Sequence, residues 1–243
     1  MHFIWHELLY RPLFNALIAI YDLIPSMGLA IILLTIITRL ALFPSQAKAL
    51  RSSKKLQELQ PELQKIQEKF KNNKQKQSQA MMEFYQTHKI NPLSSCLPTL
   101  IQFPIIIALY QVFRTGLNSE KLTELYSFIP KPETINPIFL GYFNLAQPER
   151  FILPVLAGIT QFIQTKMMMP KTAKKTASST QEIVSRQMIY FMPIMIVFFA
   201  ASLPSALPLY WVIVSLFGIL QQYLINKEKF SLQRVKVRIK SKK

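Results

Sequence analysis

The residue with the clearest chemical potential is Arg39, which lies inside the apolar run from Ala30 to Pro44. A guanidinium group near the centre of a bilayer costs about 2.5–3.5 kcal/mol on insertion scales. The later apolar segments contain no Asp or Glu, and Asp22 lies at the far end of the first segment. Arg39 therefore has to meet water, neutral polar side chains or an arriving ligand. The chemistry that it offers is electrostatic attraction of an anion.

Two structural explanations compete with a binding role for Arg39. One is snorkelling, because only five residues, about 7–8 Å of helix rise, separate Arg39 from Pro44. The other is contact with neutral polar side chains that hold helices together, which is the commoner use of such residues in membranes. Thr35 lies one turn before Arg39 and shares its face. Further polar candidates in the apolar segments are Thr38, Gln102, Gln111, Thr160, Gln161, Gln164, Ser215, Gln221 and Gln222. Their number, beside an unpaired arginine, favours a hydrated cavity open to the cytoplasm.

The sequence contains no pattern typical of an enzyme, so we expect neither catalytic residues nor covalent chemistry. It shows no paired carboxylates placed for acid–base work, no Ser-His dyad and no glycine-rich phosphate loop. One cysteine, Cys96, and three scattered histidines predict neither a disulfide nor a metal site. We therefore expect no cofactor. The N-terminal stretch lacks a basic region and a small-residue cleavage site, so we expect no removable signal peptide.

The elements that position Arg39 are predicted to be transmembrane helices. Half of the 243 residues are hydrophobic and only 17% are charged, yet the net charge is +17. The apolar and basic residues are segregated along the chain, which is typical of a membrane protein with basic loops. Five apolar segments are near the length needed to cross a bilayer, the second and fourth at its lower limit; they are 24–43, 97–113, 151–169, 188–203 and 206–225.

The connections predict the orientation of these spans. Ten Lys/Arg lie in 45–92, five in 166–187 and eight after Ile225, whereas 114–150 has four Lys/Arg balanced by four Glu. The fourth connection is uncharged. Basic loops stay in the cytoplasm, so the N-terminus is expected outside and the C-terminus inside.

Two further segments are predicted to be helical without crossing the membrane. Residues 1–22 are interpreted as an interfacial helix, or alternatively as an extension of the first span. Residues 45–92 carry an apolar seam at steps of three and four, interrupted by "KNNK" at 71–74, which predicts an antiparallel helical hairpin. Pro61 is expected to kink the first arm of the hairpin or to begin its longer piece.

Several motifs together resemble the YidC/Oxa/Alb family of membrane protein insertases. They are "TRLALFP" at 38–44, "QPEL" at 60–63, "NPLSSCLPTLIQFPIIIALYQVF" at 91–113, "LPVLAGITQFIQTKM" at 153–167 and "LPSALPLYWVI" at 203–213. The resemblance covers nearly all of residues 1–230, as a single insertase domain followed by a basic tail at 226–243. It is that of a minimal bacterial member, which implies a multi-pass protein of the bacterial cell membrane.

The resemblance implies a fold of five transmembrane helices around a hydrophilic groove that is open to the cytoplasm. Arg39 matches the groove arginine of the family, and Thr35 a polar groove residue. Gln164 matches a groove glutamine, with Gln161 as the alternative register. Trp211 matches an aromatic residue facing the groove, and Tyr210 flanks it.

The resemblance also implies partners. These are nascent membrane proteins, the Sec translocon and membrane lipids, with the ribosome and signal-recognition components reached through the hairpin 45–92 and the basic tail. Two alternative functions remain open at this point: a scaffold that assembles membrane proteins without translocating their tails, and a small pore or transporter. The tail is either a binder of RNA or anionic lipid or simply a solvated cytoplasmic tail.

Overall fold

The computed structural model describes residues 5–91, 97–116, 124–168 and 180–240, so Cys96 and parts of three predicted connections lie outside the described residues. Helices account for nearly all regular structure in these ranges, which confirms the predicted all-helical class. In chain order they are η1 (His6–Tyr10), α2 (Arg11–Leu23), α3 (Met27–Ala41), α4 (Phe43–Glu58), α5 (Gln60–Lys69), α6 (Lys74–Thr87), α7 (Leu97–Gly116), α8 (Ile152–Met167), α9 (Thr180–Ala200) and α10 (Ala206–Lys240).

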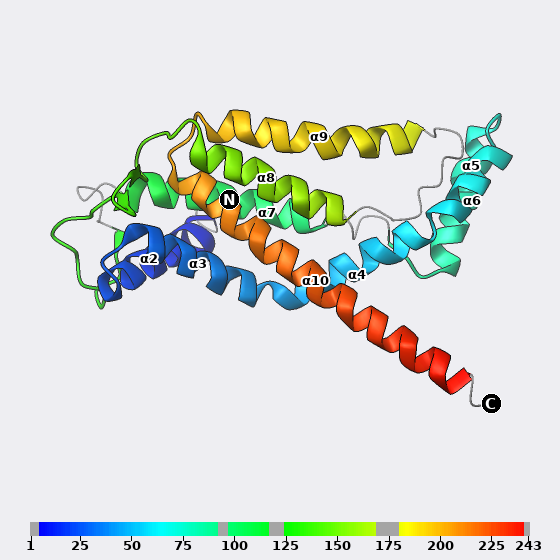
Figure 1. The fold of residues 1–243 in the computed structure, drawn as a ribbon, viewed down its shortest axis with the longest axis horizontal. Coiled ribbons are helices and arrows are strands. Elements are labelled where there is room, and N and C mark those ends of the chain that lie inside the picture. Colours follow the sequence, from blue (N-terminus) through cyan, green and yellow to red (C-terminus); the bar gives the residue numbers. More distant parts are fainter. Residues whose placement is uncertain (1–4, 92–96, 117–123, 169–179, 241–243) are drawn as a thin grey trace.

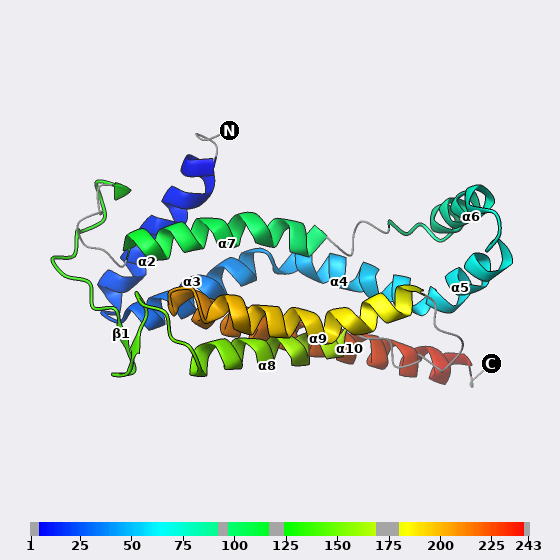
Figure 2. The ribbon, with the colours of Figure 1, turned by 90° about the horizontal axis from the view of Figure 1, so that it is seen from above.

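Helices α7, α8 and α9 run along the long axis of the molecule, and α10 extends lengthwise at an angle to α8 and α9 (Figures 1 and 2). Helix α8 packs between α9 and α10, and α10 also packs on α3. We call the end that carries α5 and α6 the hairpin end. The opposite end, where α2 joins α3 and a long connection precedes α8, is the loop end.

The membrane-crossing capacity of the helices is uneven. Within the described residues, only Ala206–Lys227 is both long and apolar enough to cross a bilayer by itself, and α3 with α4 would be a second if counted as one broken span. Helices α3 and α8 have 15 and 16 residues, which is about 22–24 Å of helix. The first span is thus shorter than the predicted 24–43, because Pro25 precedes α3 and Pro44 follows it. The five-span count stays a prediction.

A bend of 64° separates α3 from α4. Pro44 lies in the first turn of α4, where its missing N–H cannot bond the carbonyl one turn back. The Gln221 side chain of α10 donates to the Phe43 carbonyl at the bend, at 3.4 Å. Phe217 packs edge-on against the Phe43 ring. The bend is therefore supported by α10.

The N-terminal segment is a helix distinct from α3. Helix α2 ends at Leu23 and lies against both α3 and α7, with Phe14, Leu17 and Ile18 fully buried. An extended backbone at Ile24 and Ser26 interrupts the helical path before α3 begins. The segment is therefore not an extension of the first span.

Helices α5 and α6 form a hairpin at the far end of α4. Pro61 lies in the first turn of α5. Of the two expected outcomes, a kink or the start of a helix, the structure shows the second. The Asn73 side chain accepts a hydrogen bond from the Lys76 N–H and so caps α6. The break at 71–74 is thus a capped turn between two helices that contact each other.

The last helix continues past the predicted end of the fifth span. Helix α10 runs without interruption to Lys240, although the sequence predicted a separate tail from residue 226. No Gly or Pro follows Gly218, and Lys, Glu, Gln, Leu and Arg favour helix. A change from apolar to basic composition marks a change of environment, but it does not end a helix.

The connection before α8 contains a small β-hairpin that the sequence did not predict. Strand β1 (Ile138–Phe139) pairs antiparallel with β2 (Phe143–Asn144), with Phe139 opposite Phe143. Leu145 is fully buried, and its carbonyl accepts from the Ala206 N–H at the start of α10. The connection is therefore fastened to the bundle.

Candidate functional site

Arg39 lies where three helices meet. Its Nη2 donates to Oε1 of Gln102 on α7, and Nε2 of Gln102 donates to the Tyr210 hydroxyl on α10, each at 2.5 Å. Tyr210 is 1% exposed, whereas Arg39 and Gln102 are partly buried. Residues 63 and 108 positions apart thus form one hydrogen-bonded chain that links α3, α7 and α10.

The partners of Arg39 in this chain are neutral. Helices α3, α7 and α8 contain no Asp or Glu, and α10 contains none before Glu228. These helices therefore supply no carboxylate that could balance the charge of the guanidinium. The sequence left Arg39 three possible environments: water, neutral polar side chains or an arriving ligand. The structure shows contact with neutral polar side chains inside the bundle.

Thr35, the expected polar groove residue, is buried and uses its hydroxyl within α3. It is only 2% exposed, and its hydroxyl donates to the Ile31 carbonyl of the same helix at 2.6 Å. Thr38 likewise donates to the Thr35 carbonyl at 2.9 Å. Because the Thr35 hydroxyl proton is used within α3, this side chain can act toward a ligand only as an acceptor.

A second polar cluster joins α8 to α10. The Ser215 hydroxyl donates to Oε1 of Gln161 at 3.2 Å, and Nε2 of Gln161 lies 3.2 Å from the Thr165 hydroxyl. Gln164 lies against α10 one turn further along, because a Cβ placed on Gly218 would come within 2.0 Å of its Nε2. Both glutamines therefore face α10, and the alternative between them as the groove residue stays open.

The two aromatic candidates have different surroundings. Tyr210 is fully enclosed and belongs to the Arg39 chain, while Trp211 is partly buried against the hydrophobic core. The sequence assigned the larger role to Trp211. It also included Gln102 among the polar residues without placing it in the site. One signal was available, since Gln102 is the only amide side chain between Leu97 and Tyr110.

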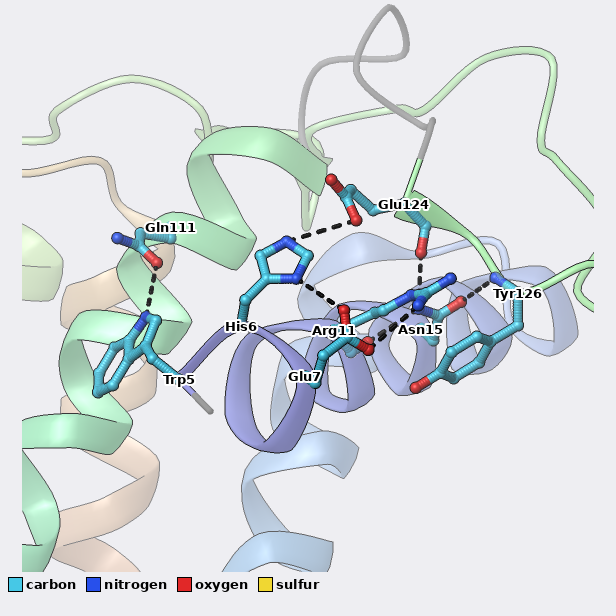
Figure 3. A network of polar contacts seen from close by, with 8 residues as sticks. All are labelled: Trp5, His6, Glu7, Arg11, Asn15, Gln111, Glu124 and Tyr126. Atoms are coloured by element: carbon cyan, nitrogen blue, oxygen red, sulfur yellow. Dashed lines mark hydrogen bonds and ion pairs between the residues drawn. The ribbon is translucent and has the colours of Figure 1, made fainter. Parts of the chain in front are cut away.

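A further polar network, at the loop end, was not foreseen (Figure 3). Asn15, which is buried, donates to the carbonyls of Arg11 and Glu124 and accepts from the Tyr126 N–H. The Arg11 guanidinium lies over the Tyr126 ring and pairs with Glu7 at 3.1 Å. This network fastens η1 and α2 to the connection before α8.

The N-terminal segment also contacts α7, and its charged side chains interact with one another at the loop end. Trp5 donates to Gln111, so this polar residue of the second apolar segment is used at a helix contact (Figure 3). Hydrogen bonds from His6 and then Arg11 hold the pKa of Glu7 below its ordinary value. His6 also lies 3.4 Å from the Glu124 carboxylate.

Comparison with known proteins gives a consistent result. The family model described as 60Kd inner membrane protein matches residues 19–233. The membrane protein insertase YidC of Oceanobacillus iheyensis is 39% identical over 204 residues, covering 82% of this chain and 74% of the relative. The membrane protein insertase MisCA of Bacillus subtilis is 38% identical over 232 residues, covering 93% and 80%.

A solved structure gives the same result at the level of the fold. It is an active YidC insertase crystal structure with the first transmembrane domain resolved, and it matches with a TM-score of 0.61 at 25% identity. The match covers 88% of this chain and 46% of the other, so this chain spans about half the length of that protein.

Proposed function

The chain belongs to the 60Kd inner membrane protein family, and we propose that it inserts membrane proteins through a polar groove between α3, α7, α8 and α10. The family places the chain in the bacterial cell membrane, and relatives named as membrane protein insertases support an insertase function. The insertase acts without covalent chemistry. The observation that carries the proposal is Arg39, a positive charge held inside the bundle by neutral partners.

The proposed topology has five spans, α3, α7, α8, α9 and α10, with the N-terminus outside the cytoplasm. Its support is the alternation of basic and neutral connections along the chain. The hairpin end, which carries α5 and α6, is then cytoplasmic, and the loop end is extracytoplasmic (Figure 1). The short helices α3 and α8 would thin the bilayer locally and shorten the path of a substrate tail.

The first step is an exchange of hydrogen-bond partners at Arg39. An acidic residue on the substrate's polar tail enters from the cytoplasm and replaces Gln102 as the acceptor. This exchange is favourable because a hydrogen bond between two charged groups is stronger than one to a neutral amide. Gln102 and Tyr210 therefore position the arginine without neutralising it.

The second step moves the substrate's apolar helix into lipid along α8 and α10. Both helices expose apolar side chains, among them Ile159, Ile163, Leu216 and Leu220. Burial of apolar substrate surface supplies about 25 cal/mol per Å², so no nucleotide is required. A membrane potential that is negative inside adds about 2.3 kcal/mol per acidic charge per 100 mV toward the outside.

The proposed partners follow from this path. Nascent membrane proteins are the substrates, and the Sec translocon is a co-operating partner for part of them. The hairpin of α5 and α6 and the basic end of α10 lie on the proposed cytoplasmic side, where ribosomes and signal-recognition components deliver substrates. Deletion of residues 229–243 tests the contact between the basic end of α10 and the ribosome, because it should reduce co-sedimentation with ribosomes.

Replacement of Arg39 tests the proposed function directly. We expect Arg39→Ala to slow insertion of a single-span protein with an acidic tail into proteoliposomes, and to leave a variant of that protein with a neutral tail much less affected. Arg39→Lys separates charge from geometry, because lysine keeps the charge and loses the planar fork. Wild-type rates in both variants would refute the role of the arginine.

Two other functions give different results in the same proteoliposomes. A pore or transporter would pass ions or solutes without any substrate protein. An assembly scaffold would cross-link substrates from the outer surface of α8 and α10 and give no cross-links from a probe at Arg39. Cross-links from Thr35, Gln164 and Trp211 to a nascent chain would support the groove.

A further inference from the structure

The most exposed large hydrophobic side chains do not lie on the helices of the bundle. Among the described residues, the five highest exposures, from 71% to 81%, belong to Leu23, Phe128, Leu140, Tyr142 and Phe151. All five lie at the loop end, either at the end of α2 or in the connection before α8. The side chains of α8 that are open to lipid are less exposed, between 42% and 50%. The most exposed side chains on η1 and α9 reach 69% at Leu8 and 68% at Phe198, so these five residues are as open to their surroundings as the outermost side chains of the helices.

Leu140 and Tyr142 are exposed residues of a β-hairpin that packs against the bundle. Strand β1 packs on α3, and the Phe139 ring fills the space above Gly28 so closely that a Cβ there would lie 2.0 Å from Cδ2. Phe139 is buried, while its neighbour Leu140 is 77% exposed. The hairpin thus anchors one aromatic ring in the bundle and presents the turn outward.

The turn itself is costly for the chain. Leu140 has a φ of 53°, in the left-handed region, which is unfavourable for a residue other than glycine. Gly141, which tolerates this region, follows with a φ of 72°. Because the Leu140 side chain is largely exposed, little packing within the protein offsets the cost. A contact outside the protein would explain why a leucine occupies this position.

Phe151 extends the exposed apolar surface of α8 at the loop end. It directly precedes α8, and exposed Ile152, Val155 and Ile159 continue the apolar surface along that helix. Aromatic side chains such as Phe151 and Tyr142 are favoured where hydrocarbon meets headgroups. The apolar surface of α8 is therefore continuous with an aromatic residue at its outer end.

We propose that Leu140, Tyr142 and Phe151 form a membrane anchor at the loop end that inserts into the outer leaflet of the bilayer. The inference rests on the membrane placement proposed above and goes beyond the insertase activity. Lipid is the occupant because Phe151 continues the exposed apolar surface of α8, and Leu140 and Tyr142 are exposed at the same end of the bundle. The anchor would hold the extracytoplasmic connection against the membrane and fix the depth at which α3 and α8 sit.

The test measures the depth of the anchor in full-length protein reconstituted into vesicles. A nitroxide label is placed at Leu140→Cys or Tyr142→Cys in a Cys96→Ser background, which removes the only native cysteine. Relaxation by oxygen, which concentrates in lipid, is compared with relaxation by a water-soluble nickel chelate. Gln147→Cys is the matched control, because it is an exposed polar position in the same connection, and Ile159→Cys on α8 marks the hydrocarbon.

We expect labels at 140 and 142 to respond several-fold more to oxygen than to nickel, as at 159, and the label at 147 to show the reverse. Labels at 140 and 142 that behave like 147 would overturn the proposal. So would lipid-like behaviour that disappears when protein is diluted in lipid, because that indicates contact between two copies of the chain. Insertion assayed in the same vesicles keeps the two proposals separate, since an exposed tip with normal insertion refutes only the anchor.

Discussion

The hydrogen bonds that link Arg39, Gln102 and Tyr210 lead to a prediction about Gln102. Replacing this residue by glutamate should affect stability and insertion activity in opposite directions. In Gln102→Glu, the neutral acceptor of Arg39 becomes a carboxylate of nearly the same shape and position. In Gln102→Leu, the acceptor is removed and the volume is roughly kept. If the function of Arg39 is to attract acidic tails, both changes should reduce insertion, but for different reasons.

The expected magnitudes follow from the geometry. Two unit charges about 4 Å apart attract by about 4 kcal/mol at an effective dielectric constant of about 20. A glutamate at 102 would therefore occupy Arg39 and cancel most of its attraction for a substrate carboxylate. The leucine instead removes a hydrogen bond to a charged group, which costs about 1.5–3 kcal/mol of stability, and leaves the Tyr210 hydroxyl without its donor.

The assay combines thermal unfolding in detergent with insertion of matched acidic-tailed and neutral-tailed substrates. Gln102→Glu should unfold at or above the wild-type temperature and lose selectivity for the acidic tail. Gln102→Leu should unfold at a lower temperature while retaining part of that selectivity. A Gln102→Glu variant that inserts acidic tails at the wild-type rate would refute the reasoning, because a neutralised arginine would then be sufficient.

The remaining predictions concern the loop end. Glu149→Ala should destabilise the protein by about 0.5–2 kcal/mol in thermal unfolding, because its carboxylate accepts the first three backbone N–H groups near the start of α8, at 2.8–3.0 Å. Burial acts to raise the pKa of Glu149, but these backbone hydrogen bonds bring that pKa below its ordinary value. The stabilisation by Glu149 should therefore be complete at neutral pH and be lost as the pH falls below about 4.3. An alanine variant that loses as much stability in acid as the wild type would exclude this role of Glu149. Gly28→Ala should cost about 1–3 kcal/mol by forcing the Phe139 ring aside, and Phe139→Leu in the same chain should restore part of the loss; additive costs would argue against the contact. Asn15→Ala should cost about 1–3 kcal/mol by leaving buried backbone groups unpaired, and hydrogen exchange at the Tyr126 amide should accelerate; unchanged protection there would count against the network.

Helix positions were predicted better than helix ends. Apolar runs located α3, α7, α8, α9 and α10 because burial in a bilayer or a core requires such runs whatever the neighbours are. The ends depended on single residues and on contacts. Pro44 set the end of α3, and the absence of any breaker let α10 continue to Lys240.

The candidate site shows the same division. Arg39 was identified from the sequence because a charge in an apolar run is costly wherever the run folds. Its direct partner, Gln102, was not selected from the polar candidates, and Tyr210 was named as a groove residue without being linked to Arg39. Their choice depends on the rotation and offset of three helices, which side-chain packing fixes and which no local pattern encodes.

The sequence by itself determined the all-helical class, the family and the location of the protein in the bacterial membrane. It also determined that the apolar segments after the first offer Arg39 no carboxylate, since they contain no Asp or Glu. Only the tertiary structure decided which neutral groups hold Arg39, and how η1 and α2 are fastened at the loop end. The hydrogen bond between Tyr126 and Asn15 joins residues 111 positions apart, and hydrogen bonds depend on distances and angles that only the packed helices define.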